Sequence, residues 1–319
     1  MSWECPHQSG DDQTCDRLGR ACEPVSKGCV LYGHVQRIGT DQEEKTMNTT
    51  KTQTETPKQE TDIRPDQTVG ELVIRHPRLR ARLEQLGVDY CCGGKRPLAE
   101  AVKVAGLELK TVLADLEQGL RADQAGAGAT DWAAVPLTVL ADHILDTHHV
   151  FTKAQLARID ALLGKVQSAH HAKHGDMLDT LRKLFDPLRA ELEAHLQKEE
   201  QILFPAIKGI DAFAAGSGAR PVVHCGSVAH PIRQMEHEHD GAGEILARMR
   251  ELTGGYRLPA DACQTFQALY EALEALEADL HEHIHLENNI LFPASVAQEA
   301  AMNPDAVGTE GATCPHRNG

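Results

Sequence analysis

The sequence predicts an all-α protein whose main domain is an antiparallel four-helix bundle. Apolar side chains recur at alternating three- and four-residue steps, as they do in helices that pack around a common core. Glycine-bearing stretches separate the long segments, and alternations of β-branched residues typical of strands are scarce. Long amphipathic segments joined by short links favour up-and-down bundle topology. The four expected helices cover about 136–168, 176–207, 228–253 and 260–297.

The remainder of the 319 residues divides into a small helical domain and two extensions. Leu72, Leu79 and Leu83 recur at helical spacing, and a Gly/Ala-rich hinge is expected at 121–132. The stretch 40–65 is polar and cannot bury enough apolar surface to offset its ordering entropy, so we expect disorder there. The predicted divisions are a disordered extension and linker 1–65, a helical domain 66–122, the bundle 132–297 and a loose tail 298–319.

Composition excludes several classes of protein. The formal net charge of −15 argues against nucleic acid or an anionic membrane as the partner. No run of about 18 apolar residues is present, and the first residues lack the basic and apolar regions of a secretory signal. We therefore expect a cytoplasmic protein whose nine cysteines are mostly reduced. No Cys-x-x-Cys pair supports a zinc ribbon.

A histidine-containing phrase occurs twice near the ends of two expected helices. "HLQKEEQILFP" covers 195–205 and "HIHLENNILFP" covers 283–293. Each places a histidine and a glutamate four residues apart, and therefore on one helix face. The chain has eighteen histidines, most of them gathered between 143 and 285.

The histidines and glutamates of these phrases continue the apolar faces of their helices without a change of phase. The second helix has the inward series Leu178, Leu181, Phe185, Leu188, Leu192, His195, Glu199, Ile202, and the fourth has Leu269, Leu273, Leu276, Leu280, His283, Glu287, Ile290. The same spacing places His239 inward on the third helix, and on the first helix His149 fits better than His148. Six polar residues should therefore face the interior: His149, His195, Glu199, His239, His283 and Glu287.

A bound metal is the expected partner of these six side chains. Burying them unpaired would cost up to several kcal/mol each, whereas imidazoles and carboxylates around a cation compensate one another. Six ligands exceed one tetrahedral zinc, and the absence of thiolates disfavours an iron–sulfur cluster. Nitrogen and oxygen donors suit a pair of irons or of manganeses, and the residues alone leave that choice open.

The other histidines are expected to have different surroundings. His237, His281 and His285 fall outside the inward series and are expected on solvated faces. His170 continues the inward series of the first helix but would lie about 30 Å from the level of His149 along a straight helix. It is an additional metal ligand only if the helix breaks early, near Gly164.

Five phrases together resemble the RIC family, the ScdA/YtfE-type proteins for repair of iron centres. They are the two repeated phrases, "DYCCGGKRPLAEA" (89–101), "DHILDTHH" (142–149) and "MEHEHDGAGEIL" (235–246). The similarity extends over about 66–296, with the phrases in the family's order. It implies a hemerythrin-like bundle preceded by a short ScdA-type domain. The two extensions fall outside it.

The resemblance implies a cofactor and a function. Two irons are expected, with His149, His195, Glu199, His239, His283 and Glu287 as ligands. Glu199 and Glu287 would bridge the irons alongside an oxo group. The resemblance implies a protein that restores iron–sulfur proteins damaged by nitric oxide or peroxide by supplying iron, so damaged iron–sulfur proteins are the expected partners. The oligomeric state, a monomer or a homodimer, stays open.

The vicinal pair Cys91-Cys92 also matches the family signature. Two thiols near Lys95 and Arg96 are expected to have a lowered pKa and a redox or thiol-exchange role, on a turn that Gly93 and Gly94 make tight. The alternative is a turn whose cysteines are small buried fillers. Adjacent cysteines form a strained ring, which disfavours a stable disulfide.

Two other functions stay open at this stage. One is a hemerythrin-like sensor or store for dioxygen or nitric oxide. The other is a di-iron redox enzyme, either one that reacts with nitrogen oxides or one of ferritin type. The ferritin signature is Glu-x-x-His on two helices, and Glu236–His239 and Glu282–His285 have that spacing, although Glu282 and His285 lie outside the apolar face.

Overall fold

The computed structural model is helical nearly throughout its described part, which confirms the all-α prediction. The described residues are 14–15, 20–21, 63–122, 130–221, 223 and 226–302. The first two of these ranges are short strands, β1 (Thr14–Cys15) and β2 (Arg20–Ala21), which pair antiparallel. Most of the predicted extension, hinge and tail lies outside the described residues.

Residues 63–122 form a compact group of short helices around buried leucines. The elements are α1 (Val69–Arg75), a 3₁₀ turn (Pro77–Leu79), α2 (Arg80–Gln85), α3 (Leu98–Val104) and α4 (Leu109–Ala122). Thr68 caps α1 reciprocally: its Oγ1 accepts from the Glu71 N–H at 3.2 Å, and its own N–H donates to the Glu71 carboxylate at 3.0 Å. Leu72, Leu83 and Leu98 are fully buried between these helices.

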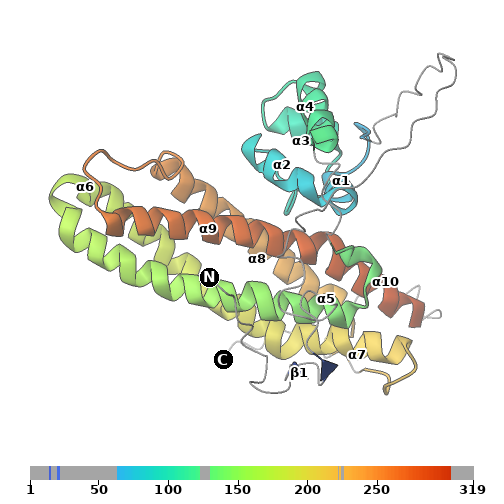
Figure 1. Ribbon diagram of the computed structural model, residues 1–319. Coiled ribbons are helices and arrows are strands. Elements are labelled where there is room, and N and C mark those ends of the chain that lie inside the picture. The colour runs from blue at the N-terminus through green and yellow to red at the C-terminus, as the bar shows by residue number, and fades with distance from the viewer. Residues whose placement is uncertain are drawn as a thin grey trace, which may run out of the picture. The chain divides into compact units, whose positions relative to one another are not determined.

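The bundle is built from six α-helices of the described part, seen side by side in Figure 1. They are α5 (Leu137–Ile144), α6 (Val150–Lys198), α7 (Phe204–Ala214), α8 (Ala229–Leu252), α9 (Gln264–Leu286) and α10 (Phe292–Met302). Helix α6 contains two bundle helices, because the backbone of His174 is non-helical (φ −124°, ψ 15°) and turns the chain back near the predicted break. Across that turn Asp160 binds both Arg182, at 2.5 Å, and Arg189, at 2.8 Å.

Three π-helical turns interrupt these helices, and each carries one of the predicted ligands. They cover Leu145–His149, Glu199–Leu203 and Glu287–Leu291. A π-turn inserts one extra residue and so rotates the next part of the helix about its axis. The predicted inward position of Ile202 is therefore wrong: Ile202 is 58% exposed, and its neighbour Leu203 is buried instead.

The repeated phrases end on a proline for a structural reason. Pro205 and Pro293 are the second residues of the helices that follow the second and third π-turns. A proline has no N–H for the helical hydrogen-bond ladder. The missing N–H therefore falls where the π-turn already interrupts the regular hydrogen-bond pattern of the helix.

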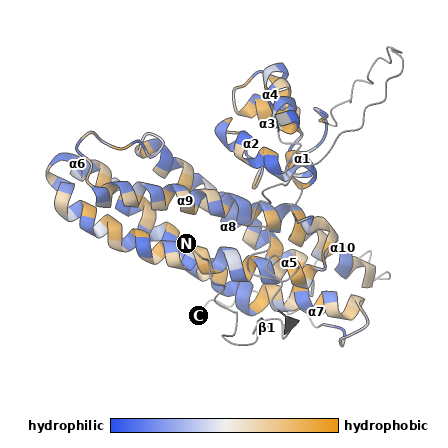
Figure 2. Ribbon diagram, viewed as in Figure 1, coloured by the Kyte–Doolittle hydropathy of each residue, from blue (hydrophilic) through white to orange (hydrophobic). Residues whose placement is uncertain are grey.

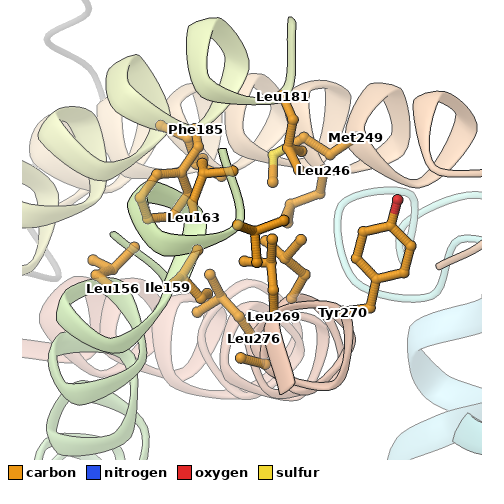
Figure 3. Packing of buried hydrophobic residues seen from close by; sticks show 14 of the residues in the cluster. Leu156, Ile159, Leu163, Leu181, Phe185, Leu246, Met249, Leu269, Tyr270 and Leu276 are labelled. Atoms are coloured by element: carbon orange, nitrogen blue, oxygen red, sulfur yellow. The ribbon is translucent and has the colours of Figure 1, made fainter. Parts of the chain in front are cut away.

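The bundle interior consists of two apolar clusters with a polar layer between them. One cluster includes Leu156, Leu192, Leu246 and Leu276, and Figure 3 shows its side chains packed between the helices. The other includes Ile144, Leu203, Met235, Leu286 and Phe292. Along every helix the predicted ligands lie between residues of the two clusters. Figure 2 shows polar and apolar residues alternating along the same helices.

Helix α10 continues to Met302, past the predicted end of the bundle at 297. Glu299 explains this, because its buried carboxylate accepts from the Val228 N–H at 3.1 Å and from the Ser227 hydroxyl at 2.6 Å. These bonds tie the end of the fourth helix to the start of the third. Within the described residues, no helix is both long and apolar enough to cross a membrane.

Candidate metal centre

The structure brings the six predicted residues together in the polar layer. They form two groups of four: His149, Glu199, His283, Glu287 and His195, Glu199, His239, Glu287. Within each group the candidate donor atoms lie within 4.8 Å of one another. All six side chains are buried, and the two glutamates are common to both groups. We call the first group site A and the second site B.

Glu199 presents one oxygen to each site. Its Oε2 lies 3.4 Å from His149 Nε2 in site A, and its Oε1 lies 3.3 Å from His195 Nε2 in site B. A carboxylate divided in this way has the geometry of a bridge between two cations.

Glu287 divides its oxygens in the same manner. Its Oε1 lies 3.1 Å from His283 Nε2 in site A, and its Oε2 lies 3.2 Å from His239 Nε2 in site B. Each glutamate therefore contributes one oxygen to each of the two groups of donors.

Several atoms of the centre are buried without a hydrogen-bond partner among the described residues. They include both carboxylate oxygens of Glu199, Oε2 of Glu287 and Nε2 of His149. In addition, His195 Nε2 faces His239 Nε2 at 3.0 Å; when both neutral rings donate from Nδ1, both Nε2 atoms are acceptors and neither supplies a proton to the other. Such unsatisfied groups are costly in an apolar interior. Cations held between them would remove that cost, so the donor set fits a metal centre.

The electrostatics of the centre keep its carboxylates ionised. Burial and mutual repulsion raise the pKa of Glu199, but His195 and His149 outweigh them and the net pKa is lowered. For Glu287 burial also raises the pKa, and His283 and His239 bring it well below its usual range. Burial lowers the pKa of His195, yet the nearby carboxylates raise it to about 10. The pKa of His283 is lowered, with burial as the main cause.

Hydrogen bonds from outside the centre orient three of the four imidazoles. His149 Nδ1 pairs with Glu200 Oε1 at 2.8 Å, and His195 Nδ1 pairs with Glu238 Oε2 at 2.8 Å. His239 Nδ1 pairs with Asn288 Oδ1 at 2.9 Å. Such partners fix the tautomer that leaves Nε2 free for a metal. Sequence reasoning missed Glu200, Glu238 and Asn288, although each is adjacent in sequence to a predicted ligand.

A cavity of about 450 Å³ opens beside the centre, between α6, α8 and α9. His195, His239 and His283 form part of its wall, and the exposed residues Glu191 and His237 lie at its rim. A small molecule in this cavity would reach the imidazoles directly.

Four expectations about other histidines have different outcomes. His237 is exposed as expected. His285 is buried, so the expected solvated position is wrong. Its ring packs edge-on to that of Tyr90, in the loop between α2 and α3, with ring centroids 5.6 Å apart. His281 is half-buried and also faces Tyr90. His170 lies in neither site and contacts Cys263 instead, at 3.2 Å, because the first helix continues past Gly164.

The glutamates of the ferritin-type signature are engaged elsewhere. Glu236 forms an ion pair with Lys95 at 2.6 Å, and Glu282 forms one with Arg80. Both cations belong to the segment of short helices before the bundle. Neither glutamate belongs to site A or site B.

One of the two vicinal cysteines, Cys91, differs from the expectation of activated thiols. Cys91 is buried, and a hydrogen bond with Cys92 together with burial raises its pKa well above the usual range, so a lowered pKa at Cys91 is wrong. Both thiols are free, with their sulfurs 4.0 Å apart. Cys92 is half-buried and lines a second cavity of about 440 Å³.

Gly94, which follows the cysteines, and Gly70 in α1 both allow close packing. A Cβ on Gly94 would lie 2.1 Å from the side chain of Asn289, and one on Gly70 would lie 2.6 Å from it. Asn289 Nδ2 in turn donates to the Tyr90 carbonyl at 3.1 Å. The cysteine-bearing loop is thus held against the π-turn that carries Glu287.

Comparison with known proteins agrees with both parts of the structure. Residues 140–295 match the hemerythrin HHE cation-binding domain, and 65–119 match ScdA_N, a domain of unknown function (DUF542). The chain is 38% identical over 234 residues to the iron-sulfur cluster repair protein YtfE of Pectobacterium atrosepticum, covering 73% of this chain and 98% of that protein. It belongs to the YtfE family.

Two further members of the YtfE family show the same degree of similarity. The proteins of Citrobacter koseri and Salmonella paratyphi B are each 38% identical over 235 residues, again with 98% of the relative covered. The described bundle is therefore a hemerythrin-like cation-binding fold, and its histidine and glutamate cluster fits a metal site.

Proposed function

We propose that this protein holds two irons and donates iron to iron–sulfur proteins whose clusters have been damaged. His149 and His283 would hold one iron, His195 and His239 the other. The observation that carries this proposal is the division of each shared carboxylate between two groups of imidazoles. The curated relatives are named for iron-sulfur cluster repair, and they match nearly their whole length.

The residues of the centre have distinct roles in this proposal. Bound iron would supply the metal that a damaged cluster lacks. Glu199 and Glu287 would bridge the two sites and neutralise the cations, and Glu200 and Glu238 would keep Nε2 of their histidines available. Because the ligands are nitrogen and oxygen rather than thiolate, a thiolate-rich client site favours transfer of iron away from the centre.

Of the two vicinal thiols, we propose Cys92 as the one that reacts. Both cysteines line the second cavity, but Cys92 is half-buried, whereas Cys91 is buried and its pKa is raised well above the usual range. The sulfur of Cys92 faces α8: a Cβ added to Gly243 would lie 3.8 Å from it. Thiol reagents should therefore label Cys92 before Cys91, which mass spectrometry of partially labelled protein would report.

Recovery of a damaged client tests the main proposal. An aconitase-type enzyme inactivated by nitric oxide would be incubated with the iron-loaded protein and its activity followed. We expect recovery with the wild type and with the His170→Ala variant, since His170 lies outside both sites. We expect none with Glu199→Ala. Equal recovery with Glu199→Ala, or none with the loaded wild type, would refute donation from this centre.

The cavity at the centre also favours a second candidate function, reaction with or storage of a small molecule such as dioxygen or nitric oxide. Its wall includes one imidazole of site A and two of site B. Rapid and reversible oxygen binding by the reduced protein, without recovery of client activity, would support this function over iron donation.

A further inference from the structure

The candidate metal centre has an internal two-fold pattern in sequence. His149 on the first helix is followed by His195 and Glu199 on the second, and His239 on the third by His283 and Glu287 on the fourth. Equivalent positions of the two halves should therefore make equivalent contacts. The contacts of the four outer nitrogens test this expectation.

One pair of outer contacts obeys the pattern. Glu200 directly follows Glu199 and reaches back to His149 Nδ1. Asn288 directly follows Glu287 and reaches back to His239 Nδ1. The contact is the same in both halves, but the acceptor is a carboxylate in the first half and a neutral amide in the second.

The other pair of outer contacts breaks the pattern. Glu238 directly precedes His239 and accepts from His195 Nδ1 at 2.8 Å. The equivalent residue, directly before His149, is His148. A histidine there stacks on the ring of His283, with centroids 5.5 Å apart and planes 9° apart, rather than offering it an acceptor.

As a result His283 has no outer partner in the described part of the chain. Its Nδ1 is buried without a hydrogen bond among the described residues. His148 is engaged elsewhere, through Nδ1 to Asp279 at 3.0 Å. A buried N–H without an acceptor is destabilising, so His283 is the one imidazole of the four whose outer nitrogen has no hydrogen-bond partner among the described residues.

The two sites therefore differ in the outer hydrogen-bond partners of their imidazoles. Site B has His195 on a carboxylate and His239 on an amide. Site A has His149 on a carboxylate, whereas His283 has no such partner among the described residues. Loss of such an outer partner typically lowers metal affinity by roughly 10–100-fold.

We propose that the two sites bind iron unequally, and that site A holds the weaker, donated iron while site B keeps its own. This inference rests on the proposed function and specifies which iron leaves. His148 is the positioning residue that sets the difference, because it occupies the place where the other half of the bundle carries Glu238. A damaged client would then take one iron per chain.

Equilibrium competition with a graded Fe(II) chelator tests the proposal without any client. The iron remaining per chain is measured anaerobically as chelator is increased. We expect two steps for the wild type, separated by roughly 10–100-fold in chelator strength. An equilibrium measurement separates affinity from the ease of access through the cavity.

Three variants assign the steps to sites. His148→Gln supplies His283 with a neutral amide acceptor like the one that Asn288 gives His239. It should raise the iron affinity of site A until the two steps merge. Glu238→Gln replaces the carboxylate that accepts from His195 Nδ1 by a neutral amide. It should lower the iron affinity of site B and move the second step toward the first. Asp279→Asn alters the contact of His148 without giving His283 an acceptor, and should leave both steps in place.

The outcomes separate this inference from the proposed function. Two irons that leave the wild type in a single step would overturn the inference alone, as would a first step that Glu238→Gln moves and His148→Gln does not. Wild-type protein that takes up fewer than two irons would overturn the proposed function, and the inference with it. Circular dichroism of each variant, compared with the wild type, identifies loss of fold.

Discussion

Two levels of the bundle contain the same types of residue and use them differently. In the polar layer between the two apolar clusters His149, His195, His239 and His283 are buried around two glutamates, three of whose four oxygens lack hydrogen-bond partners in the described part of the chain. At the far end of the bundle, the turn between the two halves of α6 carries more histidines beside an acid and a cysteine. There the polar groups are exposed or half-buried and satisfied by one another. The number of histidines therefore does not identify a metal centre, whereas burial and unsatisfied carboxylates do.

The far end shows what satisfied polar residues look like. His174 pairs with Asp261 at 2.9 Å, and Lys173 pairs with the same carboxylate at 3.0 Å. His170 pairs with Cys263 at 3.2 Å. None of these residues belongs to a group of converging ligands within the described ranges. The first two predictions contrast these levels directly.

The largest expected effect is the loss of both irons when one bridging carboxylate is removed. Because Glu199 contributes to both sites, Glu199→Ala should reduce bound iron from two per chain to none rather than to one. Glu287→Ala should do the same. Iron analysis of anaerobically reconstituted protein provides the measurement. His170→Ala is the matched control at the far end and should retain both irons; a Glu199→Ala protein that keeps one iron would argue against bridging.

The second prediction separates stability from metal binding. Phe266 is fully buried in the apolar cluster at the far end, against Tyr270. Phe266→Ala should lower the free energy of unfolding by about 3–5 kcal/mol, because it leaves a cavity. Its iron content at a temperature where it is folded should equal that of the wild type. Denaturant unfolding and iron analysis on the same samples measure both, and loss of iron from folded Phe266→Ala would show that the two levels are coupled.

The fold and the six residues of the centre were predictable from sequence because each depends on the spacing along a single helix. His195 and Glu199 continue an apolar face, and so do His283 and Glu287. Helix periodicity therefore indicated their inward position correctly. The break at His174 was also close to the expected one, next to Gly175.

Features that the periodicity of a single helix does not describe were not predictable in this way. The buried position of His285 is due to Tyr90, which lies in the loop between α2 and α3. The raised pKa of Cys91 is due to its neighbour Cys92 and to the enclosure of its loop. Ile202 was placed wrongly because a constant helical period does not include a π-turn. In each case the deciding contact or distortion lies outside the periodicity of one helix.

A third and smaller effect concerns the thiols. A hydrogen bond from His170 lowers the pKa of the exposed Cys263 to about 7, whereas the pKa of Cys91 is raised well above its usual range. Because the thiolate reacts, alkylation of Cys263 should rise with pH and reach half its maximum near pH 7. His170→Ala should move this midpoint upward. Peptide-resolved alkylation rates provide the test, and a midpoint that His170→Ala leaves in place would contradict the pairing.

The smallest expected effect is on the exposed ion pairs at the far end. Asp261→Asn removes the partner of His174 and Lys173, but these groups lie at the surface, where screening leaves such pairs little net value. The thermal midpoint should change little and bound iron not at all. A marked loss of iron in Asp261→Asn would show that the far end contributes to the metal centre.

The central claim is that two cations share Glu199 and Glu287. Mössbauer spectroscopy of wild-type protein reconstituted with enriched iron, together with iron and protein analysis, tests it most directly. The account predicts two irons per chain that are magnetically coupled through their shared ligands. One iron per chain, or two irons without coupling, would contradict it.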